Sequence, residues 1–150
     1  MKDLFQPEVV AGLRARLATL APASTRQWGT MTPAQALAHC SVAFAMTMGE
    51  AMPPRMLIGS LIGWAIKPLV LRSDAPFHRN APTAPSLVVS DQRDFEQERT
   101  RLFGNIERFA AGGPGCCTSH PHPFFGRLTP AQWSQLLYKH LDHHLRQFGV

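Results

Sequence analysis

Hydrophobic residues recur every three to four positions in four stretches of this chain, a spacing that places them on one face of an α-helix. The first stretch covers residues 4–20, and the second begins after Thr32 and runs to about Gly49. The third covers residues 91–111, and the fourth begins after Thr129 and runs to about Phe148. This pattern predicts four long amphipathic helices.

The second and fourth stretches begin with the same four residues, Thr-Pro-Ala-Gln, at positions 32–35 and 129–132. The threonine hydroxyl can accept a hydrogen bond from an amide of the first turn, and the glutamine three residues later completes a capping box. Proline suits the first helical position because an amide there would have no partner within the helix. Both sites therefore predict helix N-termini.

A further apolar run covers residues 56–71 and is interrupted by Lys67 and Pro68. A membrane span needs about 20 apolar residues, so we interpret this run as a shorter, buried helical segment. Residues 72–90 contain several prolines and no helical period, which predicts a long loop. The simplest way to bury four amphipathic faces is an all-α four-helix bundle, here a single domain over residues 1–150.

The composition excludes several classes of protein. A chain of 150 residues with 45% hydrophobic and 17% charged residues is not disordered, and three cysteines do not make a disulfide scaffold. The 15 Lys and Arg residues exceed the 10 Asp and Glu residues but are scattered, so no nucleic-acid surface is indicated. The N-terminus lacks the order of a secretory signal, and we expect a cytoplasmic protein.

The last predicted helix carries the most informative polar residues. At about 100° per residue, His140 and His144 fall within its apolar face, one turn apart, whereas His143 falls at the edge of that face. Two buried imidazoles need partners, because an unpaired buried polar group costs about 1–3 kcal/mol. A shared divalent metal ion would satisfy both rings, and hydrogen bonds to neighbouring helices are the alternative.

His39 lies midway along the second predicted helix, among small residues that leave room between helices. With His140 and His144 it would form a metal site closed on three sides and open on the fourth, the pattern of catalytic zinc. The expected ion is zinc or nickel, and iron, manganese or copper are the alternatives. No carboxylate is well placed to act as a general base, so the catalytic residues stay unassigned.

A competing set of ligands lies in the segment before the last helix. Soft sulfur with imidazole suits zinc, but this set lacks the CxxC spacing of zinc sites, and its cysteines could equally be packing residues. The set consists of Cys116, Cys117, His120 and His122. If residues 123–126 fold over the end of the bundle, His122 could instead line the three-histidine site. The other candidates for the surroundings of the metal are Cys40, His143 and Arg146.

Two segments resemble a known family. HPFFGRLT at 122–129, followed by Trp133 and by YKHLDHHLRQFG at 138–149, resembles the C-terminal signature of the DinB/YfiT-like superfamily, and more narrowly of its DUF1569 branch. RQWGTMTPAQALAHC at 26–40 is similar to the N-terminal half of the same branch. The resemblance implies a four-helix bundle with a divalent metal bound by three histidines, which map onto His39, His140 and His144.

Characterised members of that superfamily include transferases that add low-molecular-weight thiols to electrophiles, and a thiol-dependent isomerase. The resemblance therefore implies a thiol-dependent S-transferase that acts on a small molecule, with a low-molecular-weight thiol as co-substrate. A non-catalytic metal-binding or interaction protein and a metal-dependent hydrolase are the alternatives. Arg26 or Arg146 could hold an anionic group of the substrate. A homodimer is a further possibility, whereas neither nucleic acid nor a membrane is expected as a partner.

Overall fold

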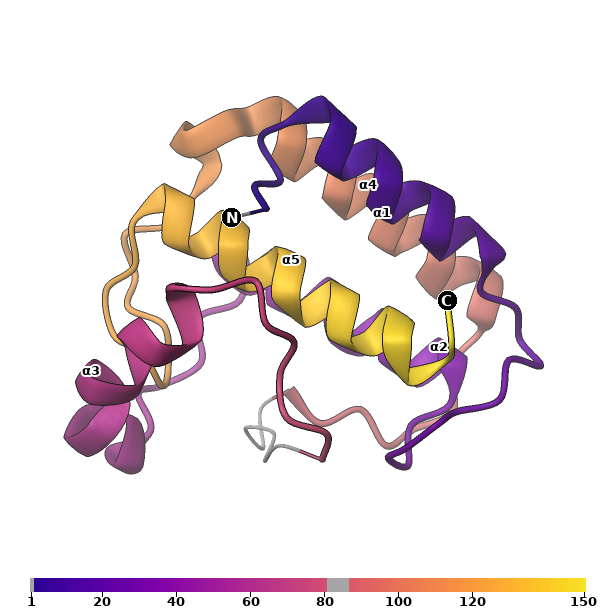
Figure 1. The fold of residues 1–150 in the computed structure, drawn as a ribbon, viewed down its shortest axis with the longest axis horizontal. Helices are drawn as coiled ribbons and strands as arrows, with labels where there is room; N and C mark the ends of the chain where they lie inside the picture. The colour runs from indigo at the N-terminus through magenta and orange to yellow at the C-terminus, as the bar shows by residue number, and fades with distance from the viewer. Residues whose placement is uncertain (1, 81–86) are drawn as a thin grey trace.

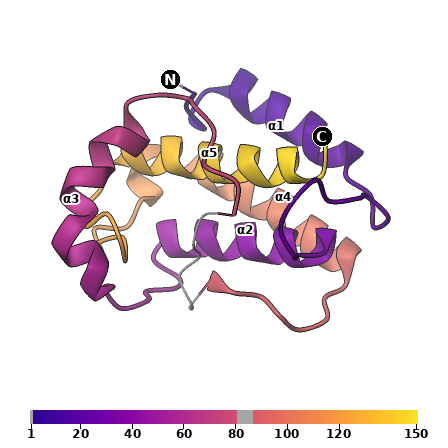
Figure 2. The same ribbon diagram turned by 60° about the horizontal axis from the view of Figure 1, so that its bottom comes forward.

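The computed structural model describes residues 2–80 and 87–150, and within these ranges the protein is all-helical. Its helices are α1 (Pro7–Thr19), α2 (Pro33–Thr47), α3 (Leu57–Leu71), α4 (Phe95–Gly112) and α5 (Pro130–Gln147). A short 3-10 turn, η2 (Gly113–Cys116), follows α4. Helices α1, α2, α4 and α5 lie alongside one another, and α3 lies outside them (Figures 1 and 2). The prediction of an all-α fold is confirmed.

Both predicted capping boxes are present, at the starts of α2 and α5. The Thr32 hydroxyl accepts from the Gln35 amide at 3.2 Å, and the Gln35 side chain accepts from the Thr32 amide at 3.0 Å. Thr129 and Gln132 form the same pair of bonds at 3.3 and 3.0 Å. These bonds fix the first turn of each of the two helices that carry the candidate metal ligands.

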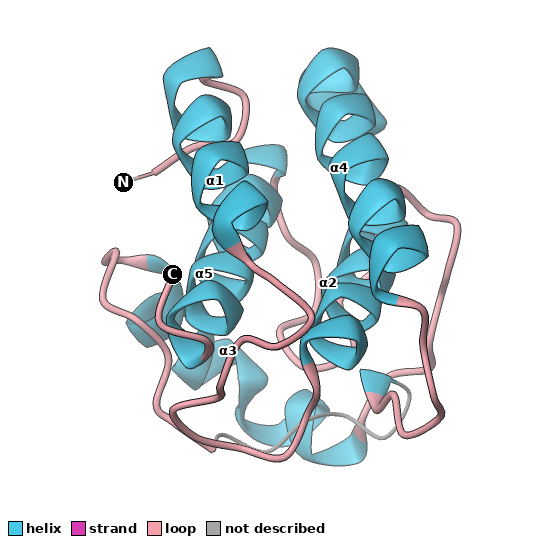
Figure 3. Ribbon diagram, turned by 90° about the vertical axis from the view of Figure 1, so that its right-hand side faces the viewer, coloured by secondary structure: helices cyan, strands magenta, loops and turns pink. Residues whose placement is uncertain are grey.

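The main core fills the space between α1, α2, α4 and α5, which Figure 3 shows nearly end-on. Phe44 of α2 packs edge-to-face on Phe109 of α4 with ring centroids 5.8 Å apart. The other fully buried members of this core include Leu13, Leu17, Leu102, Ile106, Leu141 and Leu145. Because side chains from all four helices interlock here, α2 and α5 are held in a fixed relation to each other.

Helices α1 and α4 begin later than predicted. Hydrogen bonds formed near each predicted start place the first helical turn further along the chain. The amide of Leu4 donates to the Ser134 hydroxyl at 2.7 Å, which ties residues before α1 to α5, and the helix starts at Pro7 rather than at residue 4. For α4, Asp94 rather than Asp91 accepts from the first turn, through the Gln97 amide at 2.8 Å.

The helix predicted within residues 56–71 is confirmed, but it is not shorter than α1 or α2 and it is not buried. Helix α3 has 15 residues, the same number as α2, and its buried residues are Gly59, Gly63 and Leu71. Its largest side chains face solvent, with Leu57 86% and Trp64 75% exposed. None of the helices in the described ranges combines the length and apolar character needed to cross a bilayer.

The predicted loop at 72–90 is only partly covered by the structure. Residues 72–80 are irregular, as predicted, and pass in front of α5 (Figures 1 and 2). The part of the prediction that concerns residues 81–86 lies outside the described residues. Residues 88–94, which lead into α4, also form no helix or strand.

Candidate metal centre

Helices α2 and α5 bring three histidines together in the interior. One ring nitrogen from each of His39, His140 and His144 lies within 4.8 Å of the others. His39 Nε2 and His140 Nε2 are 2.8 Å apart, and the three ring centroids are separated by 4.7–4.8 Å. The side chains of His39 and His144 are buried, whereas His140 is partly exposed to solvent. The residues that the sequence predicted as ligands therefore converge on one point.

Hydrogen bonds at Nδ1 of His39 and of His144 determine which nitrogen of each ring carries the proton. His39 Nδ1 lies 2.7 Å from the Leu87 carbonyl oxygen, and because a carbonyl only accepts, Nδ1–H donates and Nε2 keeps its lone pair. The Gln147 amide nitrogen donates to the Trp28 carbonyl at 2.9 Å, so its oxygen faces His144 Nδ1, also at 2.9 Å. His144 Nδ1–H is then the donor, and His144 Nε2 is likewise unprotonated.

Burial keeps the three rings neutral. It lowers the pKa of His39 and lowers that of His140 well below the usual 6.5, an effect that the neighbouring His39 and His144 reinforce. Burial, followed by the proximity of His39, lowers the pKa of His144 to about 3, although its bond to Gln147 acts in the opposite direction. A histidine binds a metal only in its neutral form, so these rings are ready to bind at neutral pH.

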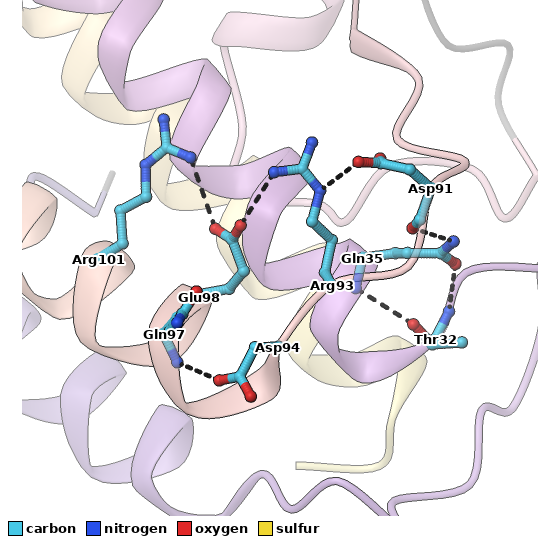
Figure 4. A network of polar contacts seen from close by, with 8 residues as sticks. All are labelled: Thr32, Gln35, Asp91, Arg93, Asp94, Gln97, Glu98 and Arg101. Atoms are coloured by element: carbon cyan, nitrogen blue, oxygen red, sulfur yellow. Dashed lines mark hydrogen bonds and ion pairs between the residues drawn. The ribbon is translucent and has the colours of Figure 1, made fainter.

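The polar contacts drawn in Figure 4 hold the segment that contains Leu87 against α2. The Gln35 side chain, one turn before His39, donates to the Asp91 carbonyl at 3.2 Å. Arg93 bridges the Asp91 carboxylate at 3.0 Å and the buried Glu98 of α4 at 3.2 Å. Because Asp91 lies four residues after Leu87, this network restrains the segment whose carbonyl orients the His39 ring.

The donor set fits a divalent ion. Two nitrogens bound to one tetrahedral zinc ion, each at about 2.0–2.1 Å, are roughly 3.4 Å apart. His39 Nε2 and His140 Nε2 are closer than this, at 2.8 Å, while the group spans up to 4.8 Å, so the rings adjust when an ion binds. Within the described residues, no fourth His, Cys, Asp or Glu joins the group. The arrangement provides three neutral nitrogen ligands for one ion.

The competing set of ligands does not come together. Cys116, Cys117, His120 and His122 form no group of side chains close enough to share an ion. His122 Nδ1 instead accepts from the amides of Phe124 and Phe125 at 3.0 and 3.2 Å. Its ring lies against Phe125 and Trp133, with centroids 4.9 and 5.5 Å away. His122 thus orders the turn before α5.

Two other candidates lie away from the histidine group. Cys40 is 1% exposed and belongs to the apolar core, where burial raises the pKa of its thiol. Arg146 is exposed and pairs with Asp142, Nε to Oδ2 at 2.8 Å. Asp142 also binds Arg16 at 2.6 Å, which holds the Arg146 side chain toward α1.

The sequence matches the family described as "Protein of unknown function (DUF1569)" over residues 7–149. The protein belongs to the DUF1569 family. This match confirms the resemblance to that branch. No curated protein and no solved structure is significantly similar to the chain, so the activity of this DUF1569 protein has to be argued from its own residues.

The surroundings of His144 in this DUF1569 protein include the candidate His143 and three residues that the sequence analysis did not select, Trp28, Phe77 and Arg79. His143, next to the candidate ligand, hydrogen bonds to the backbone of Phe77, and its ring lies 5.5 Å from Trp28 and 5.9 Å from Phe77. The exposed Arg79 places its guanidinium carbon 4.5 Å from the centre of the Trp28 ring. The buried Nε1–H of Trp28 has no hydrogen-bond partner among the described residues. Aromatic surface and a cation therefore lie beside the histidines.

Replacing Gln147 with leucine is expected to lower the affinity for zinc or nickel by about 10–100-fold. The substitution removes the acceptor that orients His144 and the donor that binds the Trp28 carbonyl. Competition with a chromophoric chelator measures the affinity. Gln97→Leu, at an exposed position on α4, is the matched control, and equal affinities for the two variants would contradict the role given to Gln147.

In the presence of a chelator, the protein is expected to lose stability as the pH falls from 6.5 toward 4. The folded chain keeps His122 neutral, because burial, followed by the charge of Arg55, lowers its pKa to about 4. The unfolded chain titrates near 6.5 and binds more protons between these values, so acid favours unfolding. The contribution of His122 to the free energy of unfolding is about 3 kcal/mol, and it is fully lost near pH 4.

His122→Asn tests this assignment, since an asparagine Oδ1 can accept from the same two amides without titrating. The melting temperature of the variant should decline less between pH 6.5 and 4 than that of the unsubstituted chain. His78→Asn, at an exposed position, should decline as the unsubstituted chain does. If His122→Asn declines equally, another group dominates the acid response.

Proposed function

We propose that this DUF1569 protein binds one divalent metal ion through His39, His140 and His144 and uses it as a thiol-dependent S-transferase of the DinB/YfiT-like type. In this proposal α1, α2, α4 and α5 form the four-helix bundle of that superfamily. The single observation that carries the proposal is the convergence of three neutral imidazoles without a fourth ligand from the described residues. Zinc or nickel is the expected ion.

The coordination set favours chemistry over storage or a structural role. Structural zinc sites are closed by four protein ligands, whereas catalytic sites keep a position open. The two residues that could have closed this site, Cys40 and His143, are held by the apolar core and by Phe77.

The nucleophilic thiol is expected to come from a co-substrate. None of the three cysteines belongs to the histidine group, and burial raises the pKa of each thiol, to about 12 for Cys117. These cysteines are therefore poor thiolates at neutral pH. A bound divalent ion would lower the pKa of an incoming thiol and hold the thiolate. The free cysteines also agree with the reducing cytoplasm that we propose as the location.

The surroundings of His144 suggest where the electrophile binds. Trp28 and Phe77 offer aromatic surface, and the exposed Arg79 offers a cation beside the Trp28 ring. This combination suits a flat or apolar electrophile with an anionic group. Arg79 replaces Arg146 in that role, because Arg146 pairs with Asp142.

The test is turnover of 1-chloro-2,4-dinitrobenzene with a panel of low-molecular-weight thiols. In this reaction a carbon–sulfur bond forms, the carbon–chlorine bond breaks, chloride leaves and the thiol proton passes to solvent. We expect metal-dependent turnover with at least one thiol and its loss in His144→Ala. If no thiol supports turnover and His144→Ala changes only the melting temperature, the transferase proposal fails and a non-catalytic metal-binding role is favoured.

A further inference from the structure

Helix α3 contacts the turn before α5 through a narrow glycine face, and Leu71 at its C-terminal end is buried in a cluster with Trp133 and Leu136. A Cβ atom added to Gly59 would lie 2.6 Å from Phe124 Cα, and one added to Gly63 would overlap the Phe124 carbonyl oxygen. The Met56 amide donates to the Pro123 carbonyl at 3.0 Å, and Lys67 Nζ donates to the Arg127 carbonyl at 2.6 Å. These contacts fix the orientation of α3 on the turn before α5.

The opposite side of α3 is apolar and exposed. At about 100° per residue, Leu57, Leu61 and Trp64 lie opposite Gly59 and Gly63, and Ile58, Ile62 and Leu69 lie along one flank. In Figures 1 and 2 the helix lies at the periphery of the molecule, beyond the ends of α2 and α5. The exposed residues are Leu57 (86%), Leu61 (74%), Trp64 (75%), Leu69 (75%), Ile58 (54%) and Ile62 (41%). We call them the α3 apolar face.

Cations outnumber carboxylates around this face. Residues 50–74 contain Arg55, Lys67 and Arg72 against Glu50 and Asp74, and Glu50 is paired with Arg108 of α4. A symmetric pairing of two α3 faces would bring the cations of one copy close to those of the other, which disfavours a second copy of the chain as the occupant. An anionic surface complements them instead.

We propose that the α3 apolar face docks on a bilayer that contains anionic lipids. The apolar side chains would enter the boundary between headgroups and acyl chains, and Arg55 and Arg72 would contact the headgroups. Trp64 is the residue type that is enriched at this depth. Helix α3 is about 22 Å long, shorter than the ~30 Å hydrocarbon core, so it would lie in the plane of the interface. This inference is independent of the metal site.

Sedimentation of the full chain with vesicles tests the inference. We expect binding to vesicles of mixed phosphatidylcholine and phosphatidylglycerol, weaker binding as salt is added, and little binding to phosphatidylcholine alone. The double substitution Leu61→Gln, Trp64→Gln should weaken binding at least about tenfold, because both side chains supply exposed apolar area. Arg72→Gln should weaken it about fivefold.

The controls carry the same chemical changes elsewhere on the surface. Val88→Gln removes an apolar side chain that is 57% exposed, and Arg26→Gln removes an exposed cation from the α1–α2 loop. Both should bind vesicles as the unsubstituted chain does, and circular dichroism confirms that all variants are folded. The proposal is overturned if the chain binds neither kind of vesicle or if the double variant binds as well as the controls. It is also overturned if the face instead forms a dimer that the double substitution dissociates, without vesicle binding.

Discussion

His140→Ala is expected to weaken the binding of zinc or nickel by more than about a hundredfold. The substitution removes one of three nitrogens that converge within 4.8 Å, and the loss of a direct ligand exceeds the 10–100-fold effects typical of residues that only orient ligands. Because a metal that binds the folded chain raises its stability, added metal should raise the melting temperature of the unsubstituted chain but not of the variant.

His143→Ala is the matched control for this prediction. His143 lies in the same turn of α5 but is not part of the histidine group, and its ring faces Trp28 and Phe77. The His143→Ala variant should retain metal affinity. Isothermal titration with each variant measures the difference. Wild-type affinity in His140→Ala, or a loss confined to His143→Ala, would show that the ligands have been assigned wrongly.

Gly63→Ala is expected to lower the free energy of unfolding by about 1–3 kcal/mol, or to detach α3 locally. The added Cβ would overlap the Phe124 carbonyl oxygen. That part of the backbone cannot easily move, because the amide of Phe124 donates to His122 Nδ1 and residues 122 and 126 exchange two backbone bonds at 2.9 and 3.1 Å. Urea denaturation gives the global effect, and proteolysis within residues 50–80 reports local release.

Gly104→Ala provides the matched control in α4. A Cβ atom there would meet nothing within 4 Å, so the substitution should stabilise the helix by up to about 1 kcal/mol through better helix propensity. The two alanine variants should therefore move stability in opposite directions. Equal stability and equal resistance to protease would mean that α3 does not pack on the turn at Phe124.

Sequence alone predicted the helices and the convergence of the histidines, because both depend on local rules. The Thr-Pro-Ala-Gln starts fix where α2 and α5 begin, and a period of 3.6 residues then fixes which face each histidine occupies. The faces of α2 and α5 that bury apolar residues in the same core pack against each other. The role of Gln147 followed the same rule, since it lies three residues after His144 on α5 and could have been inferred.

The features that sequence analysis missed depend on contacts between distant segments. Apolar content predicted the helix at 57–71 but not which of its faces packs against the protein. The glycines at positions 59 and 63, four residues apart, were the only sign of close backbone contact. Leu87 and Arg79 lie in segments without a helical period, so no pattern placed the Leu87 carbonyl against His39 or the Arg79 guanidinium over Trp28. Such partners are fixed by tertiary packing.

The most direct test is the metal content of the full chain, purified without a polyhistidine tag and analysed by plasma mass spectrometry. The proposed three-histidine site predicts about one divalent ion per chain, stable to gel filtration. It also predicts that the combined substitution of His39, His140 and His144 by alanine abolishes this content in a chain that remains helical. A chain that holds no metal and binds none on titration, or a triple variant that holds as much as the unsubstituted chain, would contradict it.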